Sequence, residues 1–367
     1  MLQLIGSKSI AKKIFIAICI IILLLFSYCI YLNYFKYSNT IVIRLTGGLG
    51  NQLYQVAFGI ALEKKTGVKI QYDTHELDRE AKKSKNRSWV RWYFDHLNIN
   101  AEKWSPNPLE KLIVKNILVN RKCNQNYYDY DGRCFKKQKV YYKKQAFENE
   151  LYFKEYYPDI RDAFLKLNEK YAHELDEKNQ AMIKDMQSHK NSVVINIRLG
   201  DFLIASNAEL NVCNFDYYKT AMKVFDNMED VHYYIFSDDI EGVKKYFKTN
   251  KPATYVDVNP LEKPYLNLIL SASAKHNIVS NSTFAIWAGM LNSNPNKIVV
   301  CPDVFYKLTD KKNPNSEWRH KYGKIANENI FPKEWIKIDT TNDKPIEIGK
   351  IDTKFSESVK DAYSKNK

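Results

Sequence analysis

The chain of 367 residues lacks the signatures of several common functional classes. It contains no Cys-x-x-Cys pair, so we expect no zinc site built on that spacing. Zinc-finger spacing, an RNA-recognition signature and a basic region followed by heptads are also missing, although the net charge is +14. A basic surface attracts polyanions in general, including acidic lipids and nucleotide diphosphates. The sequence therefore predicts no nucleic-acid partner.

Charge is absent from one long stretch near the N-terminus. Residues 14–32 form an apolar run without charge, proline or glycine. In a helix at ~1.5 Å per residue, this run spans a hydrocarbon layer of ~30 Å. Lysines precede the run and tyrosines gather at its far end, which indicates a membrane anchor with a cytoplasmic N-terminus. A cleaved signal peptide is the competing interpretation, but such peptides usually have an apolar core of ~7–15 residues and a small-x-small cleavage site, which is missing here.

After the anchor, strand-like and helix-like segments alternate along the chain in two blocks. Such alternation predicts an α/β protein with parallel sheets that helices cover on both faces. The expected division is a cytoplasmic tail at 1–13, a transmembrane helix at 14–35, a short stem at 36–40, an N-terminal α/β domain at 41–188, a C-terminal α/β domain at 189–340 and a polar tail at 341–367.

A glycine-rich turn joins the first predicted strand of the first block to its first helix. Within it, Gly48, Gly50 and Asn51 are candidate ligand contacts, because glycine lets a backbone approach a ligand and a helix N-terminus offers free N–H groups. The turn is not a dinucleotide fingerprint, since the third glycine of that pattern is Leu53 here, and it lacks the Gly-Lys-Ser/Thr ending of a P-loop. A tight turn packed against the sheet is the alternative interpretation.

Polar side chains follow three predicted strands of the second block. Arg198 and Asp238 end two of these strands, and Ser282 with Thr283 lies between a third strand and a helix. Ligands bind at the carboxyl ends of parallel strands. There a guanidinium fork can hold a diphosphate, a carboxylate can accept from guanine N–H groups, and hydroxyls with helix N–H groups can face phosphate. The alternatives are a structural ion pair for Arg198 and ordinary helix N-caps for the other residues.

Four segments in order carry a resemblance to a known family. They are IVIRLTGGLGNQLYQVAFGIAL, Asn196–Leu203, YYIFSDDIEGVKKYF and LILSASAKHNIVSNSTFAIWAGMLNSNPNKIVVCP. Together they resemble glycosyltransferase family 11, the α-1,2-fucosyltransferases, from about Ile41 to Tyr306. The resemblance implies a GT-B-like fold of two Rossmann-like domains that face a cleft, an inverting reaction, and no required metal or other cofactor.

The resemblance also implies a substrate pair and roles for the site residues. L-Fucose would move from GDP-β-L-fucose to the 2-hydroxyl of a galactose in a glycan acceptor. Arg198 would stabilise the charge that grows on the departing diphosphate. Asp73, at the end of the second predicted strand, is a candidate general base, with a loop-capping aspartate as the alternative. The predicted donor site comprises Gly48, Gly50, Asn51, Asn196, Arg198, Asp238, Ser282, Thr283 and Phe284.

Two positions depart from the family pattern and keep other functions open. Asn196 stands where the family has histidine, and Leu199 stands where it has a second arginine. Asparagine can still donate and accept hydrogen bonds, but it cannot carry charge. The alternatives are a fucosyltransferase of other regiochemistry, either α-1,6 or protein O-linked, and a catalytically silent sugar-binding homologue.

A polar loop contains two further patterns. Cys123 and Cys134 bracket it, and they either form a disulfide or remain two unpaired thiols. Inside the loop, Asp129-Tyr130-Asp131 matches an Asp-x-Asp motif that binds manganese in another transferase fold. No apolar strand precedes this motif, so we interpret it as a turn.

The expected compartment follows from the anchor and the resemblance together. We expect a single-pass type II protein of the Golgi membrane with a lumenal catalytic part. Asn86 begins a glycosylation sequon that would then be modified, whereas the sequon at Asn281 lies within the predicted donor motif and is expected to stay unmodified.

Overall fold

The computed structural model of the chain describes residues 2–83, 90–120, 123, 128–136, 140–143, 146–203, 209–308 and 316–340. Asn86 and the tail from residue 341 lie outside these ranges. The described helices are α1 (Leu2–Tyr31), the π-helix η1 (Leu32–Lys36), α2 (Leu49–Thr66), α3 (His75–Lys83), α4 (Pro108–Asn116), α5 (Tyr157–Leu165), α6 (Glu177–Ser188), α7 (Phe215–Met222), α8 (Ile240–Tyr246), α9 (Pro264–Ser271), α10 (Thr283–Leu291) and α11 (Ser316–Asn329). Short 3₁₀ helices lie at Gly132–Phe135, Glu150–Tyr152, Lys154–Tyr156, Glu169–Glu174, Gly200–Leu203 and Lys223–Phe225.

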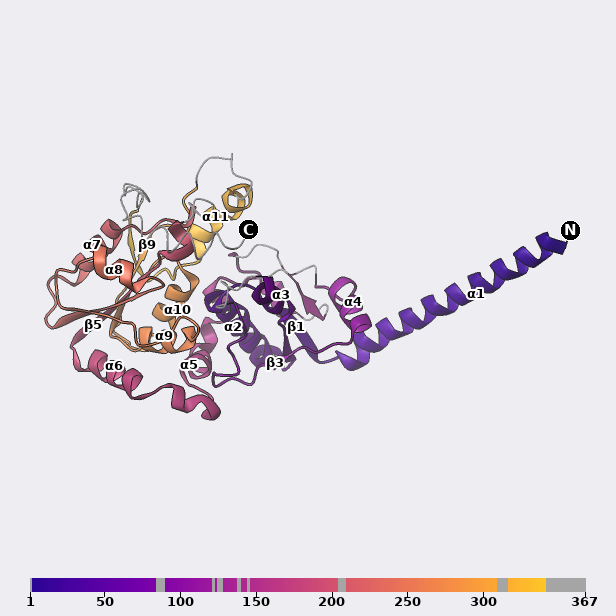
Figure 1. The fold of residues 1–367 in the computed structure, drawn as a ribbon, viewed down its shortest axis with the longest axis horizontal. Coiled ribbons are helices and arrows are strands. Elements are labelled where there is room, and N and C mark those ends of the chain that lie inside the picture. The colour runs from indigo at the N-terminus through magenta and orange to yellow at the C-terminus, as the bar shows by residue number, and fades with distance from the viewer. Residues whose placement is uncertain are drawn as a thin grey trace.

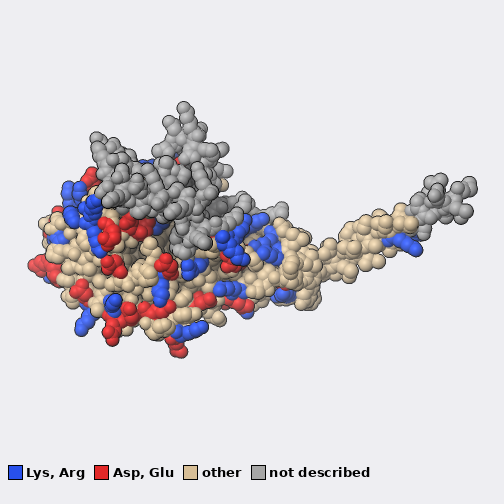
Figure 2. Space-filling view, viewed as in Figure 1, with Lys and Arg blue, Asp and Glu red and all other residues tan. Residues whose placement is uncertain are grey.

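A single long helix projects from the body of the molecule (Figure 1). Over Ile10–Lys36, α1 and η1 give one helix that is long and apolar enough to cross a membrane. Its surface is drawn almost entirely without charge, whereas charged side chains are spread over the body (Figure 2). The helix thus matches the length and composition expected of the predicted anchor.

The N-terminal sheet has four parallel strands in the order β3-β2-β1-β4. Helix α2 follows β1, buries most of its residues and ends at Gly67, whose φ of 71° suits the left-handed C-cap of a helix. The strands are β1 (Thr40–Arg44), β2 (Lys69–Asp73), β3 (Glu102–Lys103) and β4 (Tyr141–Tyr142). The predicted strand–turn–helix–strand unit is therefore present.

The C-terminal sheet has six parallel strands in the order β10-β9-β8-β5-β6-β7. Its central strand β5 is almost wholly buried, as a parallel strand covered on both faces should be. The strands are β5 (Asn191–Ile197), β6 (Val231–Ser237), β7 (Ala253–Tyr255), β8 (His276–Ile278), β9 (Val299–Pro302) and β10 (Ile336–Ile338). The α/β class with parallel sheets is thus confirmed.

The division at residue 188 stays a prediction, although α5 and α6, which precede it, pack on the C-terminal half. Helix α6 covers the C-terminal sheet, because its Met186 is fully buried in a cluster with Val194 and Tyr234. Helix α5 also packs on α9 and α10. The largest core cluster combines residues of α2 with residues of α9 and α10, so the two halves share a core.

Candidate functional site

Two charged side chains connect the ends of neighbouring strands in the C-terminal sheet. Arg198 directly follows β5 and Asp238 directly follows β6, and the last residues of these strands are register partners. Arg198 Nη1 lies 3.2 Å from Asp238 Oδ2, and the two side chains are 27% and 15% exposed. Asp238 Oδ1 also accepts a 2.9 Å hydrogen bond from the backbone N–H of Leu199. An ion pair is therefore present at Arg198, and the Arg198 side chain as a whole is only partly buried.

This pairing gives Asp238 a structural role. Both carboxylate oxygens have a contact within the protein, one with Arg198 and one with the turn at Leu199. The guanidinium of Arg198 also lies 5.6 Å from the ring centroid of Phe202. In this arrangement Asp238 fixes the position of Arg198, and its contact with a guanine base stays a prediction.

The two positions that depart from the family pattern both point into the protein. Leu199 is 2% exposed and belongs to the core beneath the C-terminal sheet. Asn196 is 5% exposed, and its Nδ2 donates to Ser271 Oγ at 3.4 Å. Its Oδ1 is buried and has no hydrogen-bond partner among the described residues. Asn196 thus contacts α9 rather than an open surface.

The glycine turn of the first half meets the Ser-Thr segment of the second half. A Cβ atom on Gly50 would lie 2.5 Å from Phe284 N and 2.6 Å from Thr283 Oγ1. The Thr283 hydroxyl donates a 2.7 Å hydrogen bond to Asn51 Oδ1. These motifs are more than 230 residues apart in the chain. Gly50 therefore allows close packing of α2 against α10, whereas the alternative interpretation had placed the turn against the sheet.

The same contact brings two helix N-termini together. Gly48 is the N-cap of α2 and Ser282 is the N-cap of α10, and neither makes a side-chain capping bond in the described part of the chain. One turn further on, the rings of Tyr54 and Trp287 pack at 5.0 Å, so both helices run in the same direction. The positive ends of two helix macrodipoles at one place favour a bound anion.

Asp73 lies at the end of β2 but inside the protein. Its side chain is 1% exposed, and its carboxylate contacts Lys115 Nζ at 2.5 Å, the Tyr141 hydroxyl and the ring of His75. Burial alone would raise the pKa of the Asp73 carboxyl. The contacts from Lys115, Tyr141 and His75 outweigh burial and hold that pKa below its ordinary value. A sugar hydroxyl has no access to this carboxylate, so Asp73 does not fit the role of a direct base.

His75 is a functional candidate that the sequence analysis missed. Its Nδ1 lies 2.5 Å from Asp73 Oδ1, and the side chain is 35% exposed. Asp73 Oδ1 also accepts from the backbone N–H of His75 at 3.1 Å, so the carboxylate caps this turn. An exposed imidazole oriented by a buried carboxylate is a recurring arrangement for a general base. The Asp-x-His spacing directly after a strand was the available signal.

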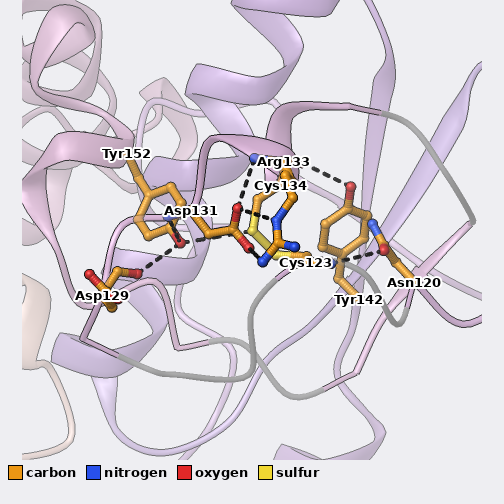
Figure 3. The surroundings of a disulfide bond; sticks show 8 residues. All are labelled: Asn120, Cys123, Asp129, Asp131, Arg133, Cys134, Tyr142 and Tyr152. Atoms are coloured by element: carbon orange, nitrogen blue, oxygen red, sulfur yellow. Dashed lines mark hydrogen bonds and ion pairs between the residues drawn. A yellow bond between two sulfur atoms is a disulfide. The ribbon is translucent and has the colours of Figure 1, made fainter.

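The polar loop is closed by a disulfide and contains a turn (Figure 3). Cys123 and Cys134 are bonded, with Cα atoms 4.7 Å apart. Arg133 donates from Nε and Nη2 to the two carboxylate oxygens of Asp131, at 2.9 and 3.0 Å. The Tyr152 hydroxyl accepts from Asp131 N and donates to Asp129 O. The Asp131 carboxylate is thus committed to Arg133, and no group of three metal-binding side chains occurs among the described residues.

The second sequon lies in the interior. Asn281 is fully buried, and its Nδ2 donates to Leu210 O and Phe305 O, both at 2.9 Å. These bonds tie the loop after β8 to two neighbouring loops. The side chain is therefore inaccessible to a glycosylating enzyme in the folded protein.

Comparison with known proteins identifies a family for the chain. Residues 40–339 match the family model described as Glycosyl transferase family 11. A protein of Escherichia coli named Alpha-1,2-colitosyltransferase is 27% identical over 329 residues, which cover 82% of this chain and 99% of that protein. The O-antigen biosynthesis glycosyltransferase WbnK of Escherichia coli is 26% identical over 303 residues, covering 73% and 95%. The crystal structure of fucosyltransferase NodZ from Bradyrhizobium superposes with a TM-score of 0.42 and 14% identity, over 68% of this chain and 91% of that one.

Proposed function

The chain belongs to glycosyl transferase family 11, and from that premise we propose that it transfers L-fucose from GDP-β-L-fucose to the 2-hydroxyl of a galactose in a glycan acceptor. The observation that carries the proposal is the pair of uncapped helix N-termini of α2 and α10. They lie at the carboxyl ends of β1 and β8, where open parallel sheets bind ligands. A dianionic diphosphate is the part of the donor that this electrostatic environment suits.

Arg198 extends the same anionic site. It follows β5, which pairs directly with β8, so Arg198 and the start of α10 share one edge of the C-terminal sheet. In an inverting transfer, the bond from the anomeric carbon to the diphosphate oxygen breaks and negative charge develops on that oxygen. The Arg198 guanidinium, held by Asp238, and the N–H groups around Thr283 would stabilise this charge as it forms.

For the acceptor, we assign the base to His75 instead of Asp73. Asp73 lies beside the end of β1, where its carbonyl accepts from Leu45 N at 3.1 Å, so its loop runs next to the glycine turn. His75 can take the proton of the attacking hydroxyl at Nε2. Its Nδ1–H would donate to the Asp73 carboxylate, which fixes the His75 tautomer with Nε2 unprotonated. The new bond joins the galactose oxygen to the anomeric carbon of fucose, and GDP leaves.

One comparison favours a second donor. The relative with 27% identity is named an α-1,2-colitosyltransferase. Colitose is L-fucose without its 3-hydroxyl, so a site for one GDP-sugar needs little change to accept the other. Parallel measurement of kcat/KM for GDP-fucose and GDP-colitose separates the two donors. The GDP-sugar with the higher kcat/KM is the preferred donor. A preference for GDP-colitose would change the sugar in our proposal and leave the proposed diphosphate site unchanged.

The N-terminal helix supports membrane anchoring as part of the proposal. Leu32, at the end of the apolar run, is fully buried in a core cluster of the catalytic part. Cleavage after this residue would remove a core side chain, so an uncleaved anchor fits the structure better than a signal peptide. Both curated relatives come from a bacterium, which has no Golgi apparatus, and we therefore propose the anchor without the organelle.

The proposed function is tested by release of GDP. The full chain is incubated with GDP-fucose in EDTA, with and without lactose as the acceptor. We expect GDP release that depends on lactose. A chain that binds GDP-fucose without turnover with any galactoside would be the catalytically silent homologue, and an acceptor other than galactose would indicate the α-1,6 or protein O-linked alternative.

A further inference from the structure

The end of the membrane helix is packed against α4. Leu32 is fully buried, and Tyr28 and Cys29 are partly buried, in a cluster that includes Ile113 and Val114 of α4. The N-cap of α4, Asn107, donates from Nδ2 to the Tyr28 hydroxyl at 3.2 Å. Helix α4 therefore lies beside the base of α1, as Figure 1 shows.

An ion pair with a buried carboxylate adds to this contact. Lys36 Nζ lies 2.8 Å from a carboxylate oxygen of Glu110, whose side chain is 1% exposed. The hydroxyl of Tyr37 donates to the same carboxylate. Since η1 ends at Lys36 and β1 starts at Thr40, only three residues separate the membrane helix from the first strand. The catalytic part is thus attached to α1 without a flexible stem.

The outer face of α4 is apolar as well. Leu109 is 43% exposed, Leu112 is 61% exposed, and Ile117, directly after the helix, is 57% exposed. The buried face already packs on the protein through Glu110, Ile113 and Val114, and the three apolar side chains belong to no core cluster formed by the described residues. An apolar stripe on an otherwise charged body indicates a contact with another apolar phase.

The position of α4 along α1 indicates which apolar phase this stripe would contact. Tyr28 precedes Leu32, the last residue of the apolar run, by about one helical turn, or ~6 Å. The side chains of Tyr31, Tyr34 and Phe35 are 50%, 68% and 69% exposed at the same end of the helix, as in the aromatic belt of a membrane protein. Interfacial helices bury their apolar face ~5–10 Å into the boundary between headgroups and acyl chains. The Asn107–Tyr28 bond places the start of α4 at this depth.

We propose that α4 is a membrane-docking helix that inserts Leu109, Leu112 and Ile117 into the lipid bilayer next to α1. The inference rests on the proposed membrane anchor and goes beyond it, because it adds a second lipid contact that fixes the orientation of the catalytic part. At its other end, α4 contributes Lys115, which contacts Asp73 and through it His75. The docked helix therefore holds the candidate base at a defined height above the membrane.

The test introduces tryptophan at the proposed contact in the full chain. Leu112→Trp and the parent chain are each reconstituted into phosphatidylcholine–phosphatidylglycerol vesicles, either ordinary or with acyl chains brominated near the glycerol end. The emission that the variant adds to that of the parent chain is compared between the two kinds of vesicle. Leu261→Trp is the matched control, because Leu261 is 56% exposed and lies in the loop before α9. Carbonate extraction of the same vesicles reports separately on the anchor.

We expect the added emission of Leu112→Trp to be largely lost in brominated vesicles and that of Leu261→Trp to be retained. Equal emission of both variants in brominated and ordinary vesicles, with the chain still in the carbonate pellet, would overturn the docking helix and leave the anchor intact. Blue-shifted emission of Leu112→Trp without quenching would also overturn it, in favour of a second protein chain on α4. Release of the chain by carbonate would overturn the anchor and the docking helix together.

Discussion

At the scale of single residues, Arg198 has a structural contact and a side chain that is only partly buried. Its pairing with Asp238 fixes one side of the guanidinium, and 27% of the side chain remains exposed. A charge that is held in place before reaction costs no reorganisation when the diphosphate departs. The ion pair and the catalytic role are therefore compatible, and a variant must be judged on both activity and stability.

We expect Arg198→Ala to lower kcat/KM for GDP-fucose by ~10²–10³, the usual effect of removing one charge-stabilising donor. Arg198→Lys should be impaired too, since an ammonium lacks the planar fork. Lys244→Ala is the control, because Lys244 pairs with Asp257 at 3.0 Å on the surface. Kinetics are measured beside Tm. Near-native turnover of both Arg198 variants would place the diphosphate elsewhere, and a large fall in Tm would make Arg198 a structural residue.

The second residue prediction concerns His75. We expect His75→Gln to reduce transfer to lactose by ~10²–10⁴, as for loss of a general base, while acceptor-independent hydrolysis of GDP-fucose changes little. His189→Gln is the matched control, because His189 Nδ1 contacts Asp230 Oδ1 at 2.8 Å in a comparable histidine–aspartate pair. Equal loss of hydrolysis and transfer would show that His75 supports the donor site or the fold, and would contradict the assignment.

Glu148 provides a prediction about pH. Burial raises the pKa of Glu148 to about 7, although a hydrogen bond with Tyr128 lowers it in part. The pKa of Glu148 in the folded chain exceeds the ordinary value, so Glu148 makes its full contribution to folding stability at acid pH. This contribution is lost as pH rises through about 7. The Tm of Glu148→Gln, relative to the parent, should therefore increase between acid and neutral pH. Exposed Glu155→Gln serves as the control, and a pH-independent difference would contradict the buried-carboxyl account.

At the scale of elements, the contact between α2 and α10 organises the site. Gly50 allows the contact, and Asn51 and Thr283 join the two helices by a hydrogen bond. We expect Gly50→Ala to destabilise the fold by ~1–3 kcal/mol, because the new methyl group meets the backbone of α10. Denaturant unfolding and donor KM are measured together, and donor affinity should fall as the helix N-termini separate.

Gly132→Ala is the control for this prediction. The nearest atom to a Cβ at Gly132 is the Tyr130 hydroxyl oxygen at 3.5 Å, an ordinary contact distance. This variant should unfold at nearly the same denaturant concentration as the parent. If Gly50→Ala were equally neutral, the close approach of α2 and α10 would not be needed for stability, and the two N-termini would not form a fixed site.

The elements also show how far the sequence could predict this structure. Alternation of apolar segments predicted the parallel sheets, and the motifs at strand ends predicted where Arg198, Asp238 and Thr283 would lie. Local pattern carries this information, since strand ends and turns are read from neighbouring residues. The boundary at residue 188 stays a prediction. In sequence α6 looks like a solvated helix, and the burial of Met186 against the second sheet could not be predicted from that pattern.

Pairings between distant residues could not be predicted. The sequence placed Asp73 after a strand, but it gave no sign that Lys115 and Tyr141 would surround that carboxylate. Likewise, the ion pair of Arg198 remained one of two interpretations until β5 and β6 were placed side by side. Such contacts depend on register and on the packing of helices, which the residue pattern of one segment does not contain.

At the scale of the whole molecule, the chain is a member of glycosyl transferase family 11 with one helix that could cross a membrane. The anchor and α4 would fix the body on the lipid surface, and the two sheets would present the donor site where α2 and α10 meet. The proposed scheme needs no metal ion, because Arg198 and helix N–H groups would meet the phosphate charge. Transfer should therefore continue in EDTA.

The most direct test of the central claim is the linkage in the glycan product. The full chain is incubated with GDP-fucose and lactose in EDTA, and the trisaccharide is examined by long-range carbon–proton NMR correlation. The account predicts an α-fucosyl anomeric proton that correlates with C2 of galactose. A correlation with any other carbon, or transfer only after Mn²⁺ is added, would contradict it.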